Sequence, residues 1–201
     1  MAVNVSVKAD IKQATRYLTK VQRKQIPFAT SLAINKTLQN IQKKEQEQMV
    51  VRLDRPTSQT VKAVRIAPSK KKVLPISGSV FLLDWAAEYL NYQIEGGTRR
   101  TKTAVPTSNA KLNKFGNIPG RKTGLLKRKT DFIATIRGTA GVWRKTGSRN
   151  NKQLRLIHAF IENPRYKPAR WPFYKIGAKV VDRKFSINFN RALADALRTA
   201  R

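Results

Sequence analysis

The sequence predicts an α+β protein in which a small antiparallel sheet is packed by N-terminal and C-terminal helices. Apolar residues recur at helical spacing near both ends of the chain, and short segments typical of strands lie between them. Strands and helices that are grouped in this way favour an α+β fold over a regularly alternating one. The length of 201 residues favours a single domain that spans residues 1–201.

The N-terminal part is expected to hold a strand and two helices. Residues 3–7 alternate between apolar and polar side chains, which is typical of a strand. Asp10 can cap a helix that begins at Ile11. Pro27 suits the first turn of a second helix, and the apolar spacing that follows predicts that this helix ends near Val50.

The next segment is expected to form a short helix, a loop and a strand. Thr57 can cap a helix that runs to Val64, and the three lysines at 70–72 indicate a loop. Residues 73–83 are rich in β-branched and aromatic side chains and predict a strand, and a turn signal at 77–78 allows a hairpin.

The middle of the chain is expected to contain a helix followed by a long arm. Asp84 can cap a helix that ends near Ile94, because Gly96 and Gly97 follow it. Residues 98–130 show no periodic pattern and carry ten basic side chains. A loop of about 30 residues is unusual in a compact domain unless it is functional. We therefore expect an extended basic loop or arm that becomes ordered on assembly.

The C-terminal part is expected to hold strands and one long helix. Residues 132–143 alternate and contain glycines, which predicts a hairpin or a bulged strand. Residues 154–161 alternate most clearly of all. Pro172 begins a helical pattern that extends to about Leu197, with a possible break near Gly177.

The charge of the chain is very unequal. Lys and Arg number 42 against 11 Asp and Glu, which gives a formal net charge of +31. Residues 96–161 contain sixteen basic residues and one acidic residue, Asp131. Such a charge favours a polyanionic partner, and nucleic-acid phosphate is the commonest one. The sequence has no zinc-finger spacing, basic zipper or clear recognition helix, so we expect backbone contacts that do not read bases.

The residues give little support for an enzyme. The single His, His158, shares a strand face with Leu156 and Phe160, which favours a structural role. The chain has no Cys, and its carboxylates are scattered, so no metal site or cofactor is expected. Residues 116–123 resemble a phosphate-binding loop, but Arg121 stands where the motif requires Gly, and no strand precedes it.

Three stretches resemble phage proteins. Residues 26–42, IPFATSLAINKTLQNIQ, are similar to the opening helix of the phage minor tail protein Z family. Residues 89–98, YLNYQIEGGT, resemble the aromatic–x–Glu–x–Gly–Thr signature of phage neck and tail-completion proteins. The positions that match this signature are Glu95, Gly97 and Thr98. Residues 168–181, PARWPFYKIGAKVV, are similar to the start of the C-terminal helix in the same proteins.

The resemblance implies a non-enzymatic virion protein of the head–tail junction, which completes the tail and prepares it for joining to the DNA-filled head. It would be assembled in the host cytoplasm into a homo-oligomeric ring, with six-fold symmetry by analogy with tail tubes. Its partners would be portal and other head–tail connector proteins, tail tube or tail terminator proteins, and packaged double-stranded DNA. No stretch approaches the ~20 apolar residues that span a bilayer, so no membrane partner is expected.

Two alternatives remain open. One is a sequence-independent nucleic-acid-binding protein of ribosomal or nucleoid type, and the other is a nuclease, for which the residues offer the least support. We expect Glu95 and Thr98 to lie at a subunit interface, where Glu95 can pair with an Arg of a neighbouring subunit. Trp171 and Phe173 are expected to anchor the last helix in the core. The residues expected to contact DNA or an acidic partner are Arg99, Arg100, Lys102, Arg121, Lys122, Lys127, Arg128 and Lys129.

Overall fold

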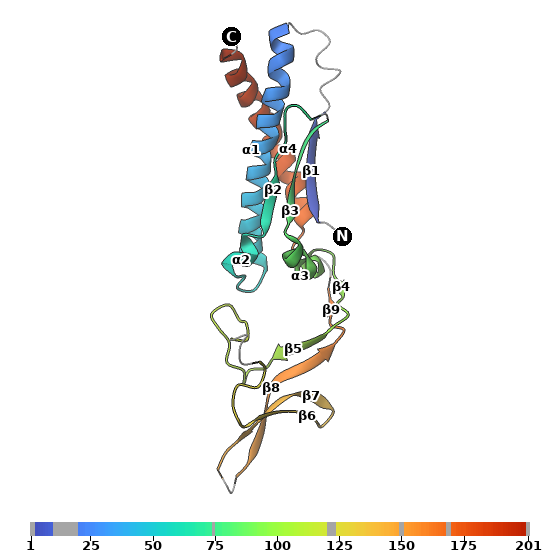
Figure 1. The fold of residues 1–201 in the computed structure, drawn as a ribbon, viewed down its shortest axis with the longest axis vertical. Helices are drawn as coiled ribbons and strands as arrows, with labels where there is room; N and C mark the ends of the chain where they lie inside the picture. Colours follow the sequence, from blue (N-terminus) through green and yellow to red (C-terminus); the bar gives the residue numbers. More distant parts are fainter. Residues whose placement is uncertain are drawn as a thin grey trace. The chain divides into compact units, whose positions relative to one another are not determined.

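The computed structural model describes residues 3–9, 20–73, 75–119, 124–148, 151–167 and 170–199. Helices and small antiparallel sheets are combined, so the predicted α+β class is confirmed. The chain forms two compact units (Figure 1). Unit 1 comprises residues 1–94 and 169–201, and unit 2 comprises residues 95–168.

Unit 1 contains a three-stranded antiparallel sheet. Its strands are β1 (Asn4–Ala9), β2 (Val64–Ala67) and β3 (Ile76–Leu82), in the order β1-β3-β2. Val7 pairs with Gly78 in the β1–β3 register, and both lie on the face that meets the helices. The strand predicted at residues 3–7 is confirmed.

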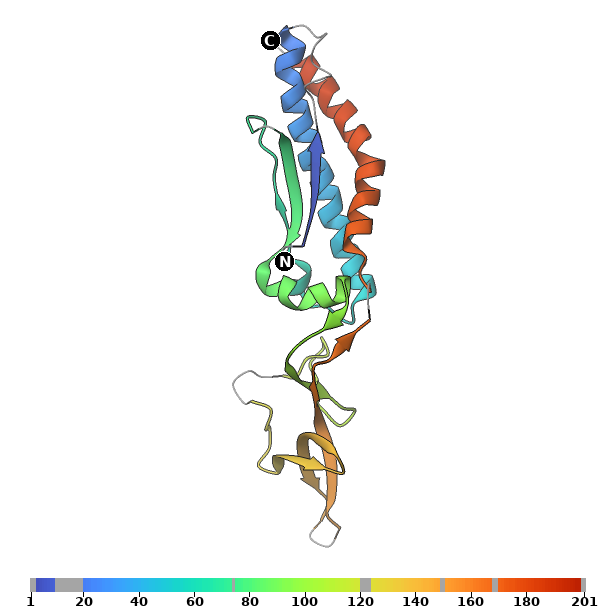
Figure 2. The same ribbon diagram turned by 90° about the vertical axis from the view of Figure 1, so that its right-hand side faces the viewer.

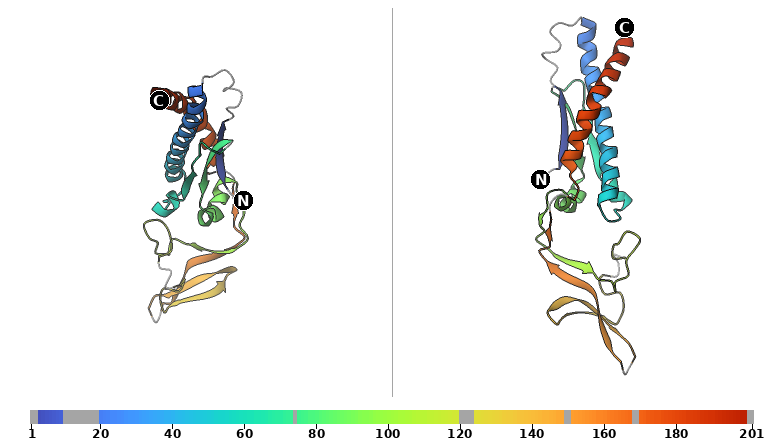
Figure 3. Two further views of the ribbon diagram at one scale, coloured as in Figure 1. Left: turned by 45° about the horizontal axis from the view of Figure 1, so that its top comes forward. Right: turned by 180° about the vertical axis from the view of Figure 1, so that it is seen from behind.

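Two long helices cover this face of the sheet (Figure 2). They are α1 (Lys20–Arg52) and α4 (Phe173–Arg198), which run antiparallel and pack along each other (Figure 3). The helix α1 buries apolar side chains at helical spacing, including Ile34, Leu38 and Ile41. Phe173 is fully buried at the start of α4, as predicted.

Two glycines mark the points where the helices approach the sheet most closely. A Cβ at Gly78 in β3 would lie 2.6 Å from Leu38 Cδ1 on α1. A Cβ at Gly177 in α4 would lie 2.8 Å from Val5 Cγ2 on β1. The predicted turn at 77–78 and the possible break near Gly177 are therefore wrong, because both glycines serve packing inside continuous elements.

The predicted helix start at Pro27 is also wrong. Pro27 lies inside α1, whose described residues begin at Lys20. An internal proline costs about 3 kcal/mol, and packing of the buried neighbours Ile26 and Ala29 offsets that cost. The helix predicted from Ile11 with its Asp10 cap lies mostly outside the described residues, whereas the predicted end near Val50 agrees with Arg52.

Two short helices complete unit 1. The helix α2 (Ser58–Val61) has the predicted cap, since Thr57 Oγ1 accepts a hydrogen bond of 3.1 Å from the Thr60 amide. It ends earlier than Val64, because Val64 already belongs to β2. The helix α3 (Asp84–Ile94) confirms its prediction. Gly96 follows α3 with φ +75°, a conformation that glycine adopts without strain.

Unit 2 contains two antiparallel sheets. A short ladder joins β4 (Gly97–Thr98) to β9 (Arg165–Tyr166). The larger sheet has the order β5-β8-β7-β6. Its strands are β5 (Lys102–Pro106), β6 (Asp131–Ile136), β7 (Thr139–Thr146) and β8 (Gln153–Glu162). The β6–β7 hairpin turns at Arg137 and Gly138, both with positive φ, as a type I′ turn requires.

The structure corrects part of the predicted arm at residues 98–130. Its first part forms β5, which pairs with the strongly predicted strand β8 through Ala104 opposite Phe160. Thr107 Oγ1 then donates a 2.6 Å hydrogen bond to the Leu156 carbonyl. The described residues 107–119 and 124–130 contain neither helix nor strand, as predicted.

Candidate nucleic-acid interface

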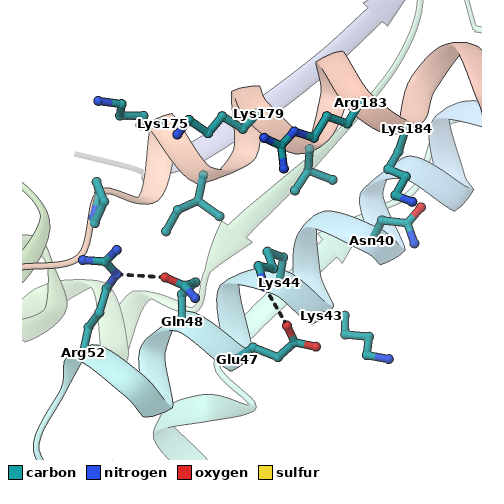
Figure 4. Close-up of a pocket in the computed structure, with 13 residues that line it drawn as sticks. Asn40, Lys43, Lys44, Glu47, Gln48, Arg52, Lys175, Lys179, Arg183 and Lys184 are labelled. Atoms are coloured by element: carbon teal, nitrogen blue, oxygen red, sulfur yellow. Dashed lines mark hydrogen bonds and ion pairs between the residues drawn. The ribbon is translucent and has the colours of Figure 1, made fainter.

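A basic groove runs between α1 and α4 in unit 1 (Figure 4). Positions 40, 44, 48 and 52 of α1 form one wall, and positions 175, 179 and 183 of α4 form the other. Each series advances by four residues, so its side chains lie on one face of their helix, about 6 Å apart along the axis. The groove has a volume of about 650 Å³.

Positive side chains dominate this groove, which we call the α1–α4 groove. The basic residues that line it are Lys43, Lys44, Arg52, Lys175, Lys179, Arg183 and Lys184. One acidic residue, Glu47, also lines it, and its carboxylate is 3.1 Å from Lys44 Nζ. Gln48 accepts a 3.0 Å hydrogen bond from Arg52 Nε. Ile176 and Val180 are half-buried and contribute apolar surface.

The α4 wall of the groove keeps its charge largely uncompensated. Lys175, Lys179 and Arg183 are all exposed, and none forms an ion pair with any residue that the structure describes. Exposed cations on facing helices repel one another, and at physiological ionic strength salt largely screens this repulsion only beyond ~8 Å. The groove therefore offers a strong local attraction for anions.

A buried carboxyl group lies on the inner side of α1 next to the groove. Glu45 is fully buried, and its Oε2 accepts a 2.8 Å hydrogen bond from Trp171 Nε1. Burial raises the pKa of Glu45 to about 8, although the Trp171 hydrogen bond and the charge of Arg52 lower it. At pH 7 this carboxyl is therefore mainly neutral, and it does not offset the positive charge of the groove.

Polar contacts fix the two walls relative to each other. Asn188 Nδ2 on α4 donates to Thr37 Oγ1 at 3.0 Å and to Asn40 Oδ1 at 3.1 Å. Further along α1, Glu45 accepts a hydrogen bond from Trp171, which lies two residues before the start of α4. The walls are thus arranged before any ligand binds, which lowers the entropic cost of binding.

The basic residues predicted near β5 have a different environment. Lys102 Nζ lies 3.2 Å from Glu162 Oε1 and 5.7 Å from the centre of the Phe160 ring. The Arg99 amide donates a 3.0 Å hydrogen bond to the Pro164 carbonyl, and Arg100 is exposed. The charge of Lys102 is therefore partly offset by its strand neighbour.

The predicted residues before β6 lie on a turn that Asp131 organises. Asp131 Oδ2 accepts 3.0 Å hydrogen bonds from the amides of Lys127 and Arg128. Arg144 makes two further hydrogen bonds to the same carboxylate, at 2.6 and 3.0 Å. These Arg144 bonds hold the pKa of Asp131 below its usual value, against the effect of burial. Arg128 and Lys129 are exposed on this turn.

The structure does not bring all the predicted residues together. Arg99 and Arg100 precede the edge strand β5 and Lys102 is its first residue, whereas residues 127–129 precede β6, the opposite edge strand of the four-stranded sheet. Arg121 and Lys122 lie outside the described residues. Glu95 and Thr98 are exposed, and their interface role stays a prediction.

Sequence reasoning missed the α1–α4 groove. Its only signal was the four-residue spacing of Lys175, Lys179 and Arg183, which also fits an ordinary solvated helix face. The decisive fact is that this face meets Lys44 and Arg52 on α1, and it depends on tertiary packing.

His158 is buried, with 2% of its surface exposed, which agrees with the structural role that the sequence favours. Burial lowers its pKa, while the charge of Asp131 opposes this shift. Within the described parts of the chain, no three His, Cys, Asp or Glu side chains gather in a way that could hold a metal ion. None of the described helices combines the length and apolar character needed to cross a bilayer.

Residues of the three stretches that resemble phage proteins make contacts that stabilise the fold. Asn35 of the first accepts a 2.7 Å hydrogen bond from the Ser69 amide and so attaches the β2–β3 loop to α1. Gly97 of the second begins the β4–β9 ladder, and Trp171 of the third is fully buried. Comparison of the chain with models of known families, with curated proteins and with solved structures finds no match.

Proposed function

We propose that this protein is a non-enzymatic virion subunit of a phage head–tail junction, a minor tail or tail-completion protein that contacts DNA phosphates without reading bases. The observation that carries the proposal is the unequal charge, a net +31 on a folded chain with seven cations and one acid in the α1–α4 groove. A protein surface usually keeps a net charge of magnitude ~2–8 and mixes both signs. This excess is best tolerated beside a dense polyanion.

Phosphate contact supports the proposed role because a channel protein needs no base readout. Each phosphate that a Lys or Arg neutralises releases counterions, which favours binding of any sequence. The resemblance of residues 26–42, 89–98 and 168–181 to phage tail proteins supports a place at the junction. Partner portal, connector, tube and terminator proteins, and a ring of six, are parts of the same proposal.

Assembly into a ring is compatible with the edges of the sheets. In the described residues, β1 and β2 each pair with β3 alone, and β5 and β6 each have one neighbour. Edge strands present unpaired backbone groups that a second chain can pair with. A ring built in this way would place several copies of each basic surface around one polyanion.

Binding and sedimentation measurements test the proposal. We expect fluorescence anisotropy to give equal affinities for duplexes of unrelated sequence, with log K falling linearly as log salt rises. Sedimentation velocity should show closed oligomers in the presence of DNA. Absence of salt-dependent DNA binding would overturn the polyanion role, and tight binding by a persistent monomer would favour the ribosomal or nucleoid alternative.

Imaging tests the location. Phage particles that carry a tagged copy of this protein, labelled with a gold-conjugated antibody, should show label where head and tail meet. Label dispersed over the head surface, or absent from particles, would overturn the virion role while leaving DNA binding intact.

A further inference from the structure

We propose that the α1–α4 groove is the principal phosphate-backbone site of this protein, and that nucleic acid bound there holds α4 onto α1. This inference rests on the proposed function, and it places the contact in unit 1 rather than at the unit 2 residues indicated by the sequence.

The cations of the groove are arranged in two rows. Lys175, Lys179 and Arg183 follow one face of α4, and Lys44 and Arg52 follow the facing side of α1 (Figure 4). Over two four-residue steps the α4 row extends about 12 Å. A row of this length matches a chain of phosphates better than a single anion, because each strand of duplex DNA carries one charge per ~3.4 Å of axis.

The acidic residues of the chain itself are too few and too scattered to fill the groove. A second copy of this chain has only 11 acidic residues, scattered along its sequence. Two of them, Glu45 and Asp131, are buried and hydrogen-bonded inside their own units. The chain therefore lacks an acidic segment that could neutralise seven cations, so the occupant of the groove is not a second copy of this chain but a different polyanion. Arg52 and Arg183 favour phosphate, whose oxygens a guanidinium can bind in pairs.

Without a bound anion, the walls of the groove repel each other. The cations of α1 and α4 repel each other across it, and Glu47 alone among the lining residues opposes this repulsion. Bound phosphates would lie between the two rows and replace repulsion by attraction. Because a ligand that binds only the folded state stabilises it, DNA should raise the melting temperature of unit 1.

Paired variants test the inference. The groove variant is Lys179→Gln with Arg183→Gln, and the matched control in unit 2 is Lys152→Gln with Arg155→Gln; each pair removes one Lys and one Arg from exposed positions. Binding of a labelled duplex is measured by anisotropy over a salt series. Because each phosphate contact contributes about 0.9 to the slope of log K against log salt, the groove variant should lose about 1.8 in slope and about 30-fold in affinity at 0.15 M salt.

The control variant should keep the wild-type slope and the DNA-induced rise in melting temperature. Equal losses in both variants would show that affinity follows net charge alone, and an unchanged groove variant would place the site elsewhere; either result overturns the inference. The conservative variant Lys179→Arg with Arg183→Lys keeps both charges and should bind like wild type, which separates loss of charge from misfolding.

Two further arms identify the occupant and separate the two proposals. Binding of phosphatidylserine vesicles and, separately, of polyglutamate is measured for wild type and for the groove variant. If the groove variant loses binding to vesicles or to polyglutamate but keeps DNA binding, the groove binds lipid or acidic protein, and the inference is overturned. If wild type binds DNA with a salt slope that the groove variant also shows, the proposed function stands and only this inference fails. If wild type binds no DNA, both fail.

Discussion

The two basic regions of this molecule differ in how their charges are compensated. In unit 1 the cations follow regular helix faces above an apolar core, and Glu47 is the one acid that lines the groove with them. In unit 2 the cations lie in turns and strand ends, where Asp131 and Glu162 pair with Arg144 and Lys102. A count of charges along the sequence favours unit 2, whereas the local balance of charges favours unit 1.

The two units also differ in the interactions that stabilise them. Unit 1 buries a continuous apolar core between its sheet and its two long helices. In unit 2, the described residues with buried hydrophobic side chains are few, and a buried ion pair contributes to holding the turn before β6. Mutations should therefore separate a unit that depends on apolar packing from one that depends more on polar contacts.

The largest effect is expected from Phe173→Ala. Phe173 is fully buried and packs edge-on against Trp171 at 5.2 Å between ring centres. Loss of this side chain should lower the free energy of unfolding by about 3–5 kcal/mol, as measured by urea denaturation. The control Ile187→Ala removes an exposed apolar side chain from the same helix and should have little effect. Equal effects of the two variants would refute the anchoring role of Phe173.

A smaller loss, confined to unit 2, is expected from Asp131→Asn. The variant leaves Arg144 without its carboxylate partner in a largely buried position, at a cost of about 3 kcal/mol. Hydrogen exchange should speed up at the Lys127 and Arg128 amides, while amides of α1 keep their protection. Unchanged exchange at these two amides would contradict the role of Asp131.

The same carboxylate predicts acid sensitivity in unit 2. Because the folded-state pKa of Asp131 is lowered, its contribution is fully present above the usual pKa of 3.8 and is lost as the pH falls through the folded value. Asp131→Asn should therefore remove part of the acid destabilisation of unit 2.

An opposite pH dependence is expected in unit 1 from Glu45. Below pH 4.5 Glu45 is protonated in both states; between pH 4.5 and about 8 only the unfolded state ionises, so the free energy of unfolding falls as pH rises. The slope is about 1.4 kcal/mol per pH unit. Glu45→Gln keeps an oxygen acceptor for Trp171 and should abolish this slope. Stability curves at pH 6 and pH 7 measure it.

His158 in unit 2 gives a pH dependence of the opposite sign to that of Glu45. Burial lowers the folded-state pKa of His158, so its contribution to unit 2 increases as pH rises towards 6.5 and is complete above that value. Because wild type and Glu45→Gln both contain His158, its contribution cancels when their free energies of unfolding are subtracted. If that difference does not change between pH 6 and pH 7, the carboxyl of Glu45 is not held neutral.

The smallest effect is expected from Asn188→Ala. The variant removes two hydrogen bonds that join α4 to Thr37 and Asn40 of α1. We expect a loss of about 1 kcal/mol, measured by thermal unfolding. The exposed residue Asn190 on the same helix supplies the control Asn190→Ala, which should change stability by less.

Much of the fold could be predicted because its signals are local. The apolar spacing of α1 and α4, the Thr57 cap and the alternation of β8 all depend on residues close together in sequence. The elements that were missed depend on distant partners. Four residues of β2 and five of β5 carry too little pattern of their own, and each is defined by pairing with β3 or β8.

The α1–α4 groove was missed for the same reason, and none of the predicted contact residues lines it. The acid-free segment drew attention to unit 2, because a linear count does not show that Asp131 contacts Lys127, Arg128 and Arg144. The α1–α4 groove joins residues that are more than a hundred positions apart in the chain. Its charge is visible in the sequence, but its concentration in one groove is not.

The hydrogen bond from the Trp171 amide to the Gln93 carbonyl, 3.1 Å long, has a topological consequence. It places the last turn of α3 beside the residues that begin α4, so the two cut points of unit 1 are already neighbours. Excision of residues 95–168 and closure with a short glycine-containing bridge would thus close a small loop, which carries a low entropic cost. We therefore expect unit 1 to keep its fold when such a bridge replaces unit 2.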